Sequence, residues 1–129
     1  MINTKPFTFE GLFLYYDMNV EEIRDFALSL KDSSESFPFG EDTIVFKTNN
    51  KMFLLLPLDE VDQLKINVKC NPELAILLRE EFPDTILPGY HMNKKHWNTI
   101  VIDGRLSWSR IKEMIEDSYG LVKGKGREM

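Results

Sequence analysis

The sequence has little cysteine, no long apolar run and no catalytic signature. Cys70 is the only cysteine in 129 residues, so an internal disulfide is excluded and no Cys-x-x-Cys metal site exists, which suits a reducing cytosol. No apolar run approaches the roughly 20 residues that a membrane span needs. Glycine-rich phosphate loops and G-x-S-x-G motifs are also absent. We therefore expect a cytoplasmic, non-enzymatic protein with no cofactor and no membrane partner.

Histidine is scarce as well. His91 and His96 are the only two histidines, and lysines stand between them. Their spacing matches neither the helical pair of a zinc protease nor a Cys/His finger. We therefore expect no metal site at these residues.

The length and composition fit one soluble globular domain. Apolar residues make up 43% and charged residues 29% of the chain, which is enough apolar material for one core. We assign residues 18–122 to the domain, residues 1–17 to an N-terminal extension and residues 123–129 to a flexible tail. Phe7, Phe9, Phe13 and Tyr15 share one parity, which favours an added strand or an arm packed on the domain.

The first half of the domain predicts a helix followed by three strands. Asn19 and Glu22 form a capping pair, and apolar residues then recur at helical spacing, which predicts a helix from about Asn19 to Lys31. Residues 43–48 and 52–58 are β-rich runs around Asn49-Asn50-Lys51, a composition typical of a tight hairpin. Residues 65–70 alternate, with Ile66, Val68 and Cys70 expected on one side. The segment DSSESFPFGED between helix and hairpin is predicted to be a connector.

The second half predicts helix, strand and helix. Asn71 and Pro72 are typical of a helix start, followed by an expected apolar stripe of Leu74, Leu77, Leu78 and Phe82. Residues 97–102 predict a strand, and Asp103-Gly104 a turn. Ser107 is expected to cap a last helix that runs through Val122, with Gly120 near its end as a left-handed cap.

This order of elements predicts the fold class. Strands joined by short turns, with helices at the start and end, favour an α+β two-layer sandwich with a mainly antiparallel sheet and helices on one face. The opposite face would then present Lys65, Asn67 and Lys69, together with Trp97 and Thr99.

Charge is distributed unevenly along a chain whose net charge is -5. No acidic residue lies between Asp84 and Asp103, and residues 86–112 hold five cations against one carboxylate. The predicted strands are basic and the predicted helices acidic. A positive sheet face would concentrate an anionic partner on one side of the molecule. The alternative is that these lysines only provide solubility and deter strand pairing.

The connector PGYHMNKKHW gathers residue types that bind phosphates and bases. The candidate residues for nucleic-acid or anion binding are Lys47, Lys65, Lys69, Tyr90, His91, Asn93, Lys94, Lys95, His96 and Trp97. The alternative is a structural loop, in which Tyr90 and Trp97 anchor the core and one of the histidines pairs with the backbone.

Several motifs together resemble the MmcQ/YjbR family of small bacterial proteins. They are NVEEIRDFALSL, ESFPFGEDTIVFK, INVKCNPELA, PGYHMNKKHWNTIVIDG and DSYGLV, and the resemblance covers about residues 18–122. Matching positions are Phe37, Pro38, Gly40, Asp42, Lys69, Pro72 and the unbroken run from Pro88 to Trp97. The resemblance implies a CyaY-like fold, similar to frataxin, and DNA binding. Residues 1–17 depart from the family, whose members usually start near Met18.

Three functions are expected from these observations. The first is DNA binding, in an unknown physiological role, through the basic sheet face and the His/Lys loop. The second is a non-enzymatic binding or adaptor module for a small anionic ligand or a partner protein. The third, an iron site on Glu21, Glu22 and Asp25, follows from the frataxin analogy alone, and exposed helix carboxylates are usually only solvated.

Overall fold

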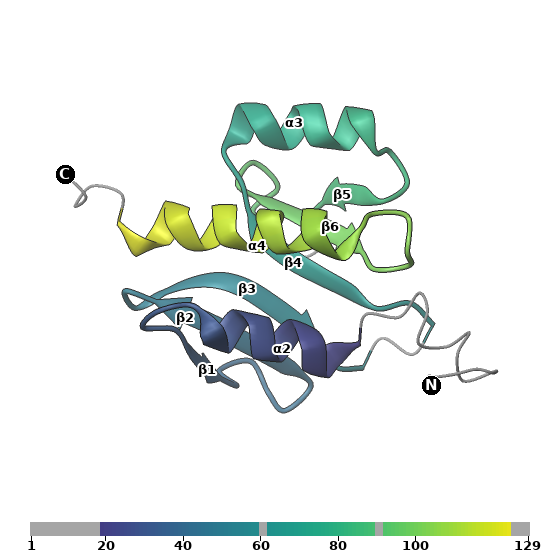
Figure 1. The fold of residues 1–129 in the computed structure, drawn as a ribbon. Helices are drawn as coiled ribbons and strands as arrows, with labels where there is room; N and C mark the ends of the chain where they lie inside the picture. The colour runs from purple at the N-terminus through teal and green to yellow at the C-terminus, as the bar shows by residue number, and fades with distance from the viewer. Residues whose placement is uncertain (1–18, 60–61, 90–91, 125–129) are drawn as a thin grey trace.

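A computed structural model describes residues 19–59, 62–89 and 92–124. This part of the chain forms a six-stranded sheet with three helices (Figure 1). The helices are α2 (Val20–Ser29), α3 (Pro72–Glu81) and α4 (Trp108–Lys123); the strands are β1 (Ser34–Ser36), β2 (Thr43–Thr48), β3 (Lys51–Pro57), β4 (Lys65–Lys69), β5 (Ile86–Pro88) and β6 (Trp97–Val101). The strand order is β1-β2-β3-β4-β6-β5, and every neighbouring pair is antiparallel. The predicted α+β class with an antiparallel sheet is confirmed.

Each helix begins where its capping residue predicts. The Asn19 side chain accepts a hydrogen bond from the backbone N–H of Glu22, whose carboxylate accepts one from the N–H of Asn19. The Asn71 carboxamide oxygen accepts from the N–H of Glu73, and the Ser107 hydroxyl accepts from that of Arg110. These bonds satisfy N–H groups that have no partner within the helix.

The β2–β3 hairpin has the expected tight turn. Asn49 and Asn50 have φ of 55° and 64°, the left-handed geometry of a two-residue turn that matches the twist of the strands. One register shift occurs between Phe46 and Lys47, where β3 carries an extra residue, Phe53. The bulge leaves both Phe53 and Leu54 in the core on the helix side.

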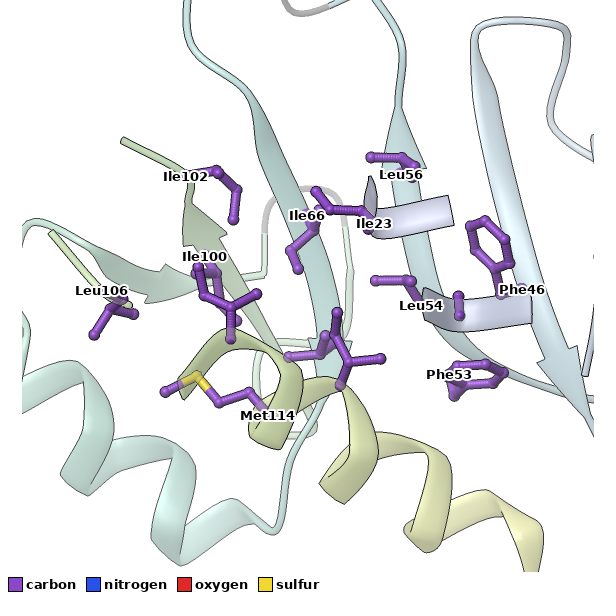
Figure 2. Close-up of a cluster of buried hydrophobic side chains, with 14 of the residues drawn as sticks. Ile23, Phe46, Phe53, Leu54, Leu56, Ile66, Ile100, Ile102, Leu106 and Met114 are labelled. Carbon is purple, nitrogen blue, oxygen red and sulfur yellow. The ribbon is translucent and has the colours of Figure 1, made fainter. Parts of the chain in front are cut away.

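The core lies between the sheet and the helices. Figure 2 shows strand residues such as Ile66 and Leu54 meeting helix residues such as Ile23 and Met114 in one cluster. Burying an aliphatic side chain of this size contributes roughly 1.5–3 kcal/mol. Figure 1 shows α2 and α4 in front of the strands and α3 alongside them. All three helices contribute to this one cluster, so they cover the same face of the sheet.

Several predictions of local structure are wrong in detail. On α3 the buried residues are Ala75 and Leu78, whereas Leu74 and Leu77 are exposed, so the expected stripe is rotated around the helix. The last helix continues through Gly120, and its left-handed cap is Gly124 with φ 109°. The short strands β1 and β5 were not predicted at all.

Some predictions fall on residues outside the described ranges. They concern the extension 1–17 with its alternating aromatic residues, the tail beyond residue 124, and two members of the candidate site, Tyr90 and His91. Among the described helices, none is both long enough and apolar enough to cross a membrane.

Candidate functional site

The face of the sheet opposite the helices, called here the helix-free face, can be read from the strand register. Cross-strand partners point to the same side of a sheet. Leu55 pairs with Asn67, Asn67 with Thr99, and Thr99 with Leu87, which makes one row across four strands. Lys69 pairs with Trp97 in the next row toward the β2–β3 turn. The predicted assignment of Lys65, Asn67 and Lys69 to one face agrees with this register.

Lysines gather at one end of this face, called here the basic end. The β2–β3 turn, the end of β4 and the start of β6 all lie at that end because the strands are antiparallel. The basic end consists of Lys47 and Lys69 on the face itself, Lys51 beside the β2–β3 turn, and Lys94, Lys95 and His96 in the loop before β6. Strands lie about 4.8 Å apart, so Lys47 on β2 and Lys69 on β4 are separated by roughly 10 Å. Flexible lysine side chains at this spacing can contact separate phosphates of one backbone.

Lys69 is the central cation of the basic end. Its amine lies 5.6 Å from the centre of the Trp97 ring, over the ring face. Its backbone N–H donates to the Ser118 hydroxyl (2.8 Å), which donates to the Phe53 carbonyl oxygen (2.6 Å) and ties the strand to α4. The side chain is therefore held by its ring partner and by its own fixed backbone.

No carboxylate in the described part of the chain neutralises the charge of Lys69. Burial and, to a smaller extent, the positive charge of Lys51 lower the pKa of Lys69 below its ordinary value. Among the described residues, no carboxylate forms an ion pair with the amine of Lys47, Lys51 or Lys69. An anion bound at this point would relieve the repulsion between the two amines.

The helix-free face is less open than expected. Trp97, Asn67 and Thr99 are only 5%, 8% and 3% exposed. Trp97 packs in a second apolar cluster with Val45 and Leu55. The expectation that these three polar and aromatic residues form an exposed platform is wrong. A buried indole cannot stack on a base, so the contact of Trp97 with Lys69 is its only described link to the exposed cations.

The loop between β5 and β6 is held together by its own hydrogen bonds. The Asn93 carboxamide oxygen accepts from the N–H of Lys95 (2.9 Å), and the Lys94 amine donates to the Gly89 carbonyl oxygen (3.3 Å). Arg79 on α3 donates to the Lys94 carbonyl oxygen, and its Nε donates to the Asn98 carboxamide oxygen (2.7 Å). The Asn93 side chain therefore has a structural role, while Lys94, Lys95 and His96 remain exposed.

Gly89 allows this loop to close against β6. Its N–H donates to the Trp97 carbonyl oxygen at 2.9 Å. A Cβ at this position would lie 2.8 Å from the Trp97 Cβ and 3.0 Å from the Trp97 carbonyl oxygen, which is closer than real Cβ contacts. The loop thus reaches Trp97 only with a glycine at its start.

Lys65 does not lie with the other candidate residues. It stands at the opposite end of β4, four residues and therefore roughly 13 Å from Lys69. The chain segments that flank the strands at that end carry carboxylates rather than lysines. These carboxylates belong to Glu41, Asp42, Asp59, Asp62 and Asp103.

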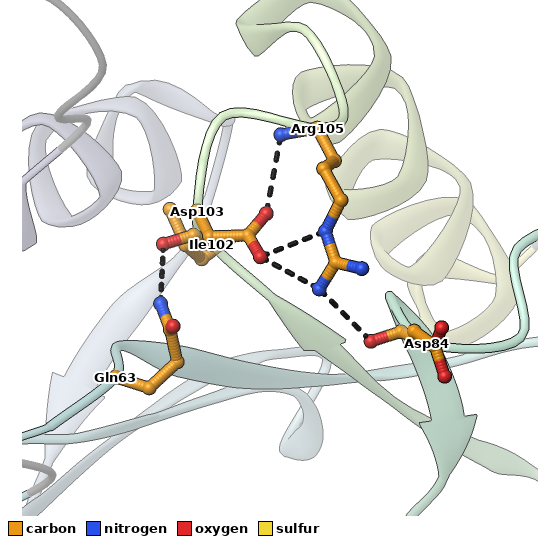
Figure 3. A network of polar contacts seen from close by, with 5 residues as sticks. All are labelled: Gln63, Asp84, Ile102, Asp103 and Arg105. Atoms are coloured by element: carbon orange, nitrogen blue, oxygen red, sulfur yellow. Dashed lines mark hydrogen bonds and ion pairs between the residues drawn. The ribbon is translucent and has the colours of Figure 1, made fainter.

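The cations that follow β6 are occupied by other groups. Arg105 binds the Asp103 carboxylate through Nε (2.8 Å) and Nη2 (2.6 Å), and its Nη2 also donates to the Asp84 carbonyl oxygen (3.1 Å), an arrangement called here the Arg105 corner (Figure 3). The hydrogen bond from the Arg105 side chain, together with the Arg105 backbone N–H and charge, lowers the pKa of Asp103. Arg110 pairs with Glu113 at 3.6 Å. The excess of cations over residues 86–112 therefore does not form one patch.

One member of the basic end, Lys51, was absent from the predicted set. It follows the turn residue Asn50 at the start of β3 and is exposed. The tight turn already places the two hairpin strands together, so a lysine directly after it could have been assigned to the same end as Lys47 from the sequence.

The acidic residues of α2 do not converge on a common point. Glu22 caps its own helix, and Glu21 and Asp25 are exposed. Within the described ranges, no group of three His, Cys, Asp or Glu side chains could hold a metal ion.

Comparison with known proteins places the chain in a family. The family model described as YjbR matches residues 28–121. The chain belongs to the YjbR family. This confirms the resemblance seen in the sequence.

The similar proteins agree with that assignment. The uncharacterised protein YbdF of Escherichia coli O157:H7 is 36% identical over 103 residues, which cover 79% of this chain and 82% of YbdF. The uncharacterised protein YjbR of Escherichia coli K12 is 28% identical over 102 residues, or 79% and 85% of the two chains. A crystal structure of a Deinococcus radiodurans protein with the DUF419 domain superposes with a TM-score of 0.77 at 37% identity, covering 84% and 80%.

Proposed function

We propose that this YjbR-family chain binds DNA through the basic end of its helix-free face. The observation that carries the proposal is the arrangement of Lys69 and Lys51, two mutually repelling amines with no carboxylate partner among the described residues. Lys47, Lys94 and Lys95 extend the cluster on both sides. Lysine ammonium groups at this spacing suit phosphate oxygens, which carry no sequence information.

The buried state of Trp97 limits the kind of binding. Stacking on bases needs an accessible ring, and Trp97 is 5% exposed. Contacts would therefore be made to the phosphate backbone, with weak sequence preference and a strong dependence on salt. The exposed carboxylates of the helices would repel DNA, so only the helix-free side can approach it.

A salt series tests the proposal. If all five lysines of the basic end contact phosphates, the logarithm of the affinity for a duplex should fall against the logarithm of the salt concentration with a slope of about -4.5. Changing Lys51 and Lys69 together to Gln should reduce the magnitude of the slope by about 2.

The control is a second double variant, which has the same net charge as the variant of Lys51 and Lys69 but carries its changes on the helix side. Lys31, which follows α2, and Lys112, whose amine lies over the Trp108 ring on α4, are changed to Gln together. This variant should keep the parent slope. An affinity no tighter than that of an unrelated protein of equal charge, or equal slopes for the two double variants, would end the proposal.

Other expectations remain predictions. An adaptor role for a partner protein, a CyaY-like fold and a cytoplasmic location are consistent with the sequence. A ligand pocket built on the loop of β5 and β6 is supported less, because Lys94, Lys95 and His96 are exposed and the Asn93 side chain bonds within the loop.

A further inference from the structure

A hollow of about 890 Å³ lies on the helix-free face and extends from the end of β4 that carries Lys65, across the Asn67 row, to Met92 in the loop between β5 and β6. It crosses β2, β3, β4, β6 and β5, so at about 4.8 Å per strand spacing it is roughly 19 Å long. Its volume falls within the range of about 300–1,000 Å³ that is usual for small-molecule sites. None of the lysines proposed to bind DNA is among its described lining residues, and it borders their cluster only at Met92.

Most of the lining is apolar. The apolar residues are Phe39, Leu55, Pro57, Leu87, Pro88 and Met92. Phe39 stands at the rim with 63% of its surface exposed, which is unusual for a phenylalanine. An apolar ligand in the hollow would remove this ring from water, and the burial of the ring surface would contribute to the free energy of binding.

One polar group is directed at the floor of the hollow. The Asn67 side chain is 8% exposed, and its carboxamide oxygen accepts a hydrogen bond of 2.5 Å from the Thr99 hydroxyl. Its amide nitrogen makes no hydrogen bond to any described residue. This nitrogen is not completely sealed from solvent. The end of the amide that is not bound to Thr99 therefore faces the hollow, where its N–H groups can donate to water or to a ligand that replaces the water.

The charged groups that line the hollow do not favour a ligand of either net charge. Lys65 and Asp59 both line it, with opposite signs. Neither a polyanion such as a nucleotide nor a polycation fits such a lining. The buried amide, with two N–H donors, selects instead for one oxygen acceptor.

From this geometry we infer that the hollow binds a small, mostly apolar molecule with one carbonyl or carboxylate oxygen, which accepts from the Asn67 amide. This goes beyond the proposed DNA binding and does not depend on it. The apolar body would lie along Leu55, Leu87 and Met92, with the Phe39 ring closing over it.

Three eight-carbon probes separate the possible ligand chemistries. Octanamide has a neutral oxygen acceptor, octanoate a charged one, and octylamine has none. Titration of the full chain, followed by amide NMR shifts, should show octanamide or octanoate binding at least tenfold more tightly than octylamine. The shifts should centre on Leu55, Asn67 and Leu87 and leave Lys51, beside the β2–β3 turn, unchanged.

Two variants test the residues themselves. Asn67→Leu should weaken the better acceptor probe by about tenfold and bring it to the level of octylamine, because the loss of one hydrogen bond of this kind corresponds to such a factor. Thr43→Trp, a half-buried position on the lining, should fill the hollow and abolish binding of all three probes. Thermal unfolding of each variant checks that it is folded. If Asn67→Leu does not fold, the binding measurements on Thr43→Trp test the inference.

The outcomes are distinct from those of the DNA proposal. Asn67→Leu should leave the DNA salt slope unchanged, and the double variant of Lys51 and Lys69 should keep the probe affinities. The inference would be overturned if none of the probes caused NMR shifts at millimolar concentration. It would also be overturned if the parent and Thr43→Trp bound the probes equally, or if all three probes had equal affinities.

Discussion

The basic end and the Arg105 corner both carry cations, but only one of them leaves its charge available. At the Arg105 corner two side-chain nitrogens and one backbone N–H of Arg105 are bound by Asp103. At the basic end the amine of Lys69 has an aromatic ring and a second amine beside it. The difference teaches that a count of charges along a segment does not predict a positive surface, because pairing decides which cations can attract a ligand.

The largest expected effect comes from breaking the support of the basic end. Gly89→Ala should lower the free energy of unfolding by about 2 kcal/mol, because the new methyl group overlaps the backbone and Cβ of Trp97. Urea unfolding measures this change.

The matched control is Gly120→Ala inside α4, where an added Cβ meets no atom within 4 Å. It should stabilise the protein by about 0.5–1 kcal/mol. Equal stability of Gly89→Ala and the parent would contradict the assigned close contact.

A smaller effect is expected at the Arg105 corner. Asp103→Asn should cost about 1 kcal/mol at neutral pH, since the carboxylate is partly screened by solvent. The folded-state pKa of Asp103 is lowered, so this contribution is present above the unfolded value of about 3.9 and is lost as the pH falls through the folded value. Unfolding measured near pH 7 and near pH 2 should therefore show a difference between parent and variant only at the higher pH.

Glu113→Gln is the control for that measurement. Its pair with Arg110 is longer, at 3.6 Å, and the Glu113 side chain is 63% exposed. The change should stay within about 0.5 kcal/mol at either pH. If Asp103→Asn costs the same at both pH values, the ion pair is not the source of its effect.

The smallest expected effect on stability is at Lys69. Lys69→Met should change the free energy of unfolding by no more than about 0.5 kcal/mol at neutral pH, because the contact with Trp97 is offset by burial and by repulsion from Lys51. The folded-state pKa of Lys69 is below 10.5, so the folded protein releases this proton first as the pH rises. The parent should therefore gain stability relative to the variant as the pH approaches the ordinary lysine value. Stability curves at pH 7 and pH 10 measure the sign, and a relative loss by the parent would contradict it.

The sequence predicted the fold where local signals were strong. The caps at Asn19, Asn71 and Ser107 and the Asn49-Asn50 turn are local chemistry, and all four lie where expected. The strands β1 and β5 could not be found in this way, because three residues such as Ser34–Ser36 carry no periodic pattern and become a strand only by pairing with a neighbour.

The candidate site was predicted only in part because alternation gives the side of a sheet and not its exposure. Lys69 and Trp97 lie on one face as the pattern indicated, but the burial of Trp97 depends on its packing with Val45 and Leu55 from other strands. The separation of Lys65 from Lys69 follows from the length of one strand and could have been computed. The ion pairing of Arg105 with its near neighbour Asp103 was also within reach of the sequence.

The two outer strands of the sheet have a consequence for how any partner can approach. Both β1 and β5 are only three residues long, and β5 ends in Pro88, which has no N–H to donate. Short outer strands of this kind offer a poor template for an incoming peptide that would extend the sheet. Growth into fibres by edge-to-edge pairing is disfavoured for the same reason.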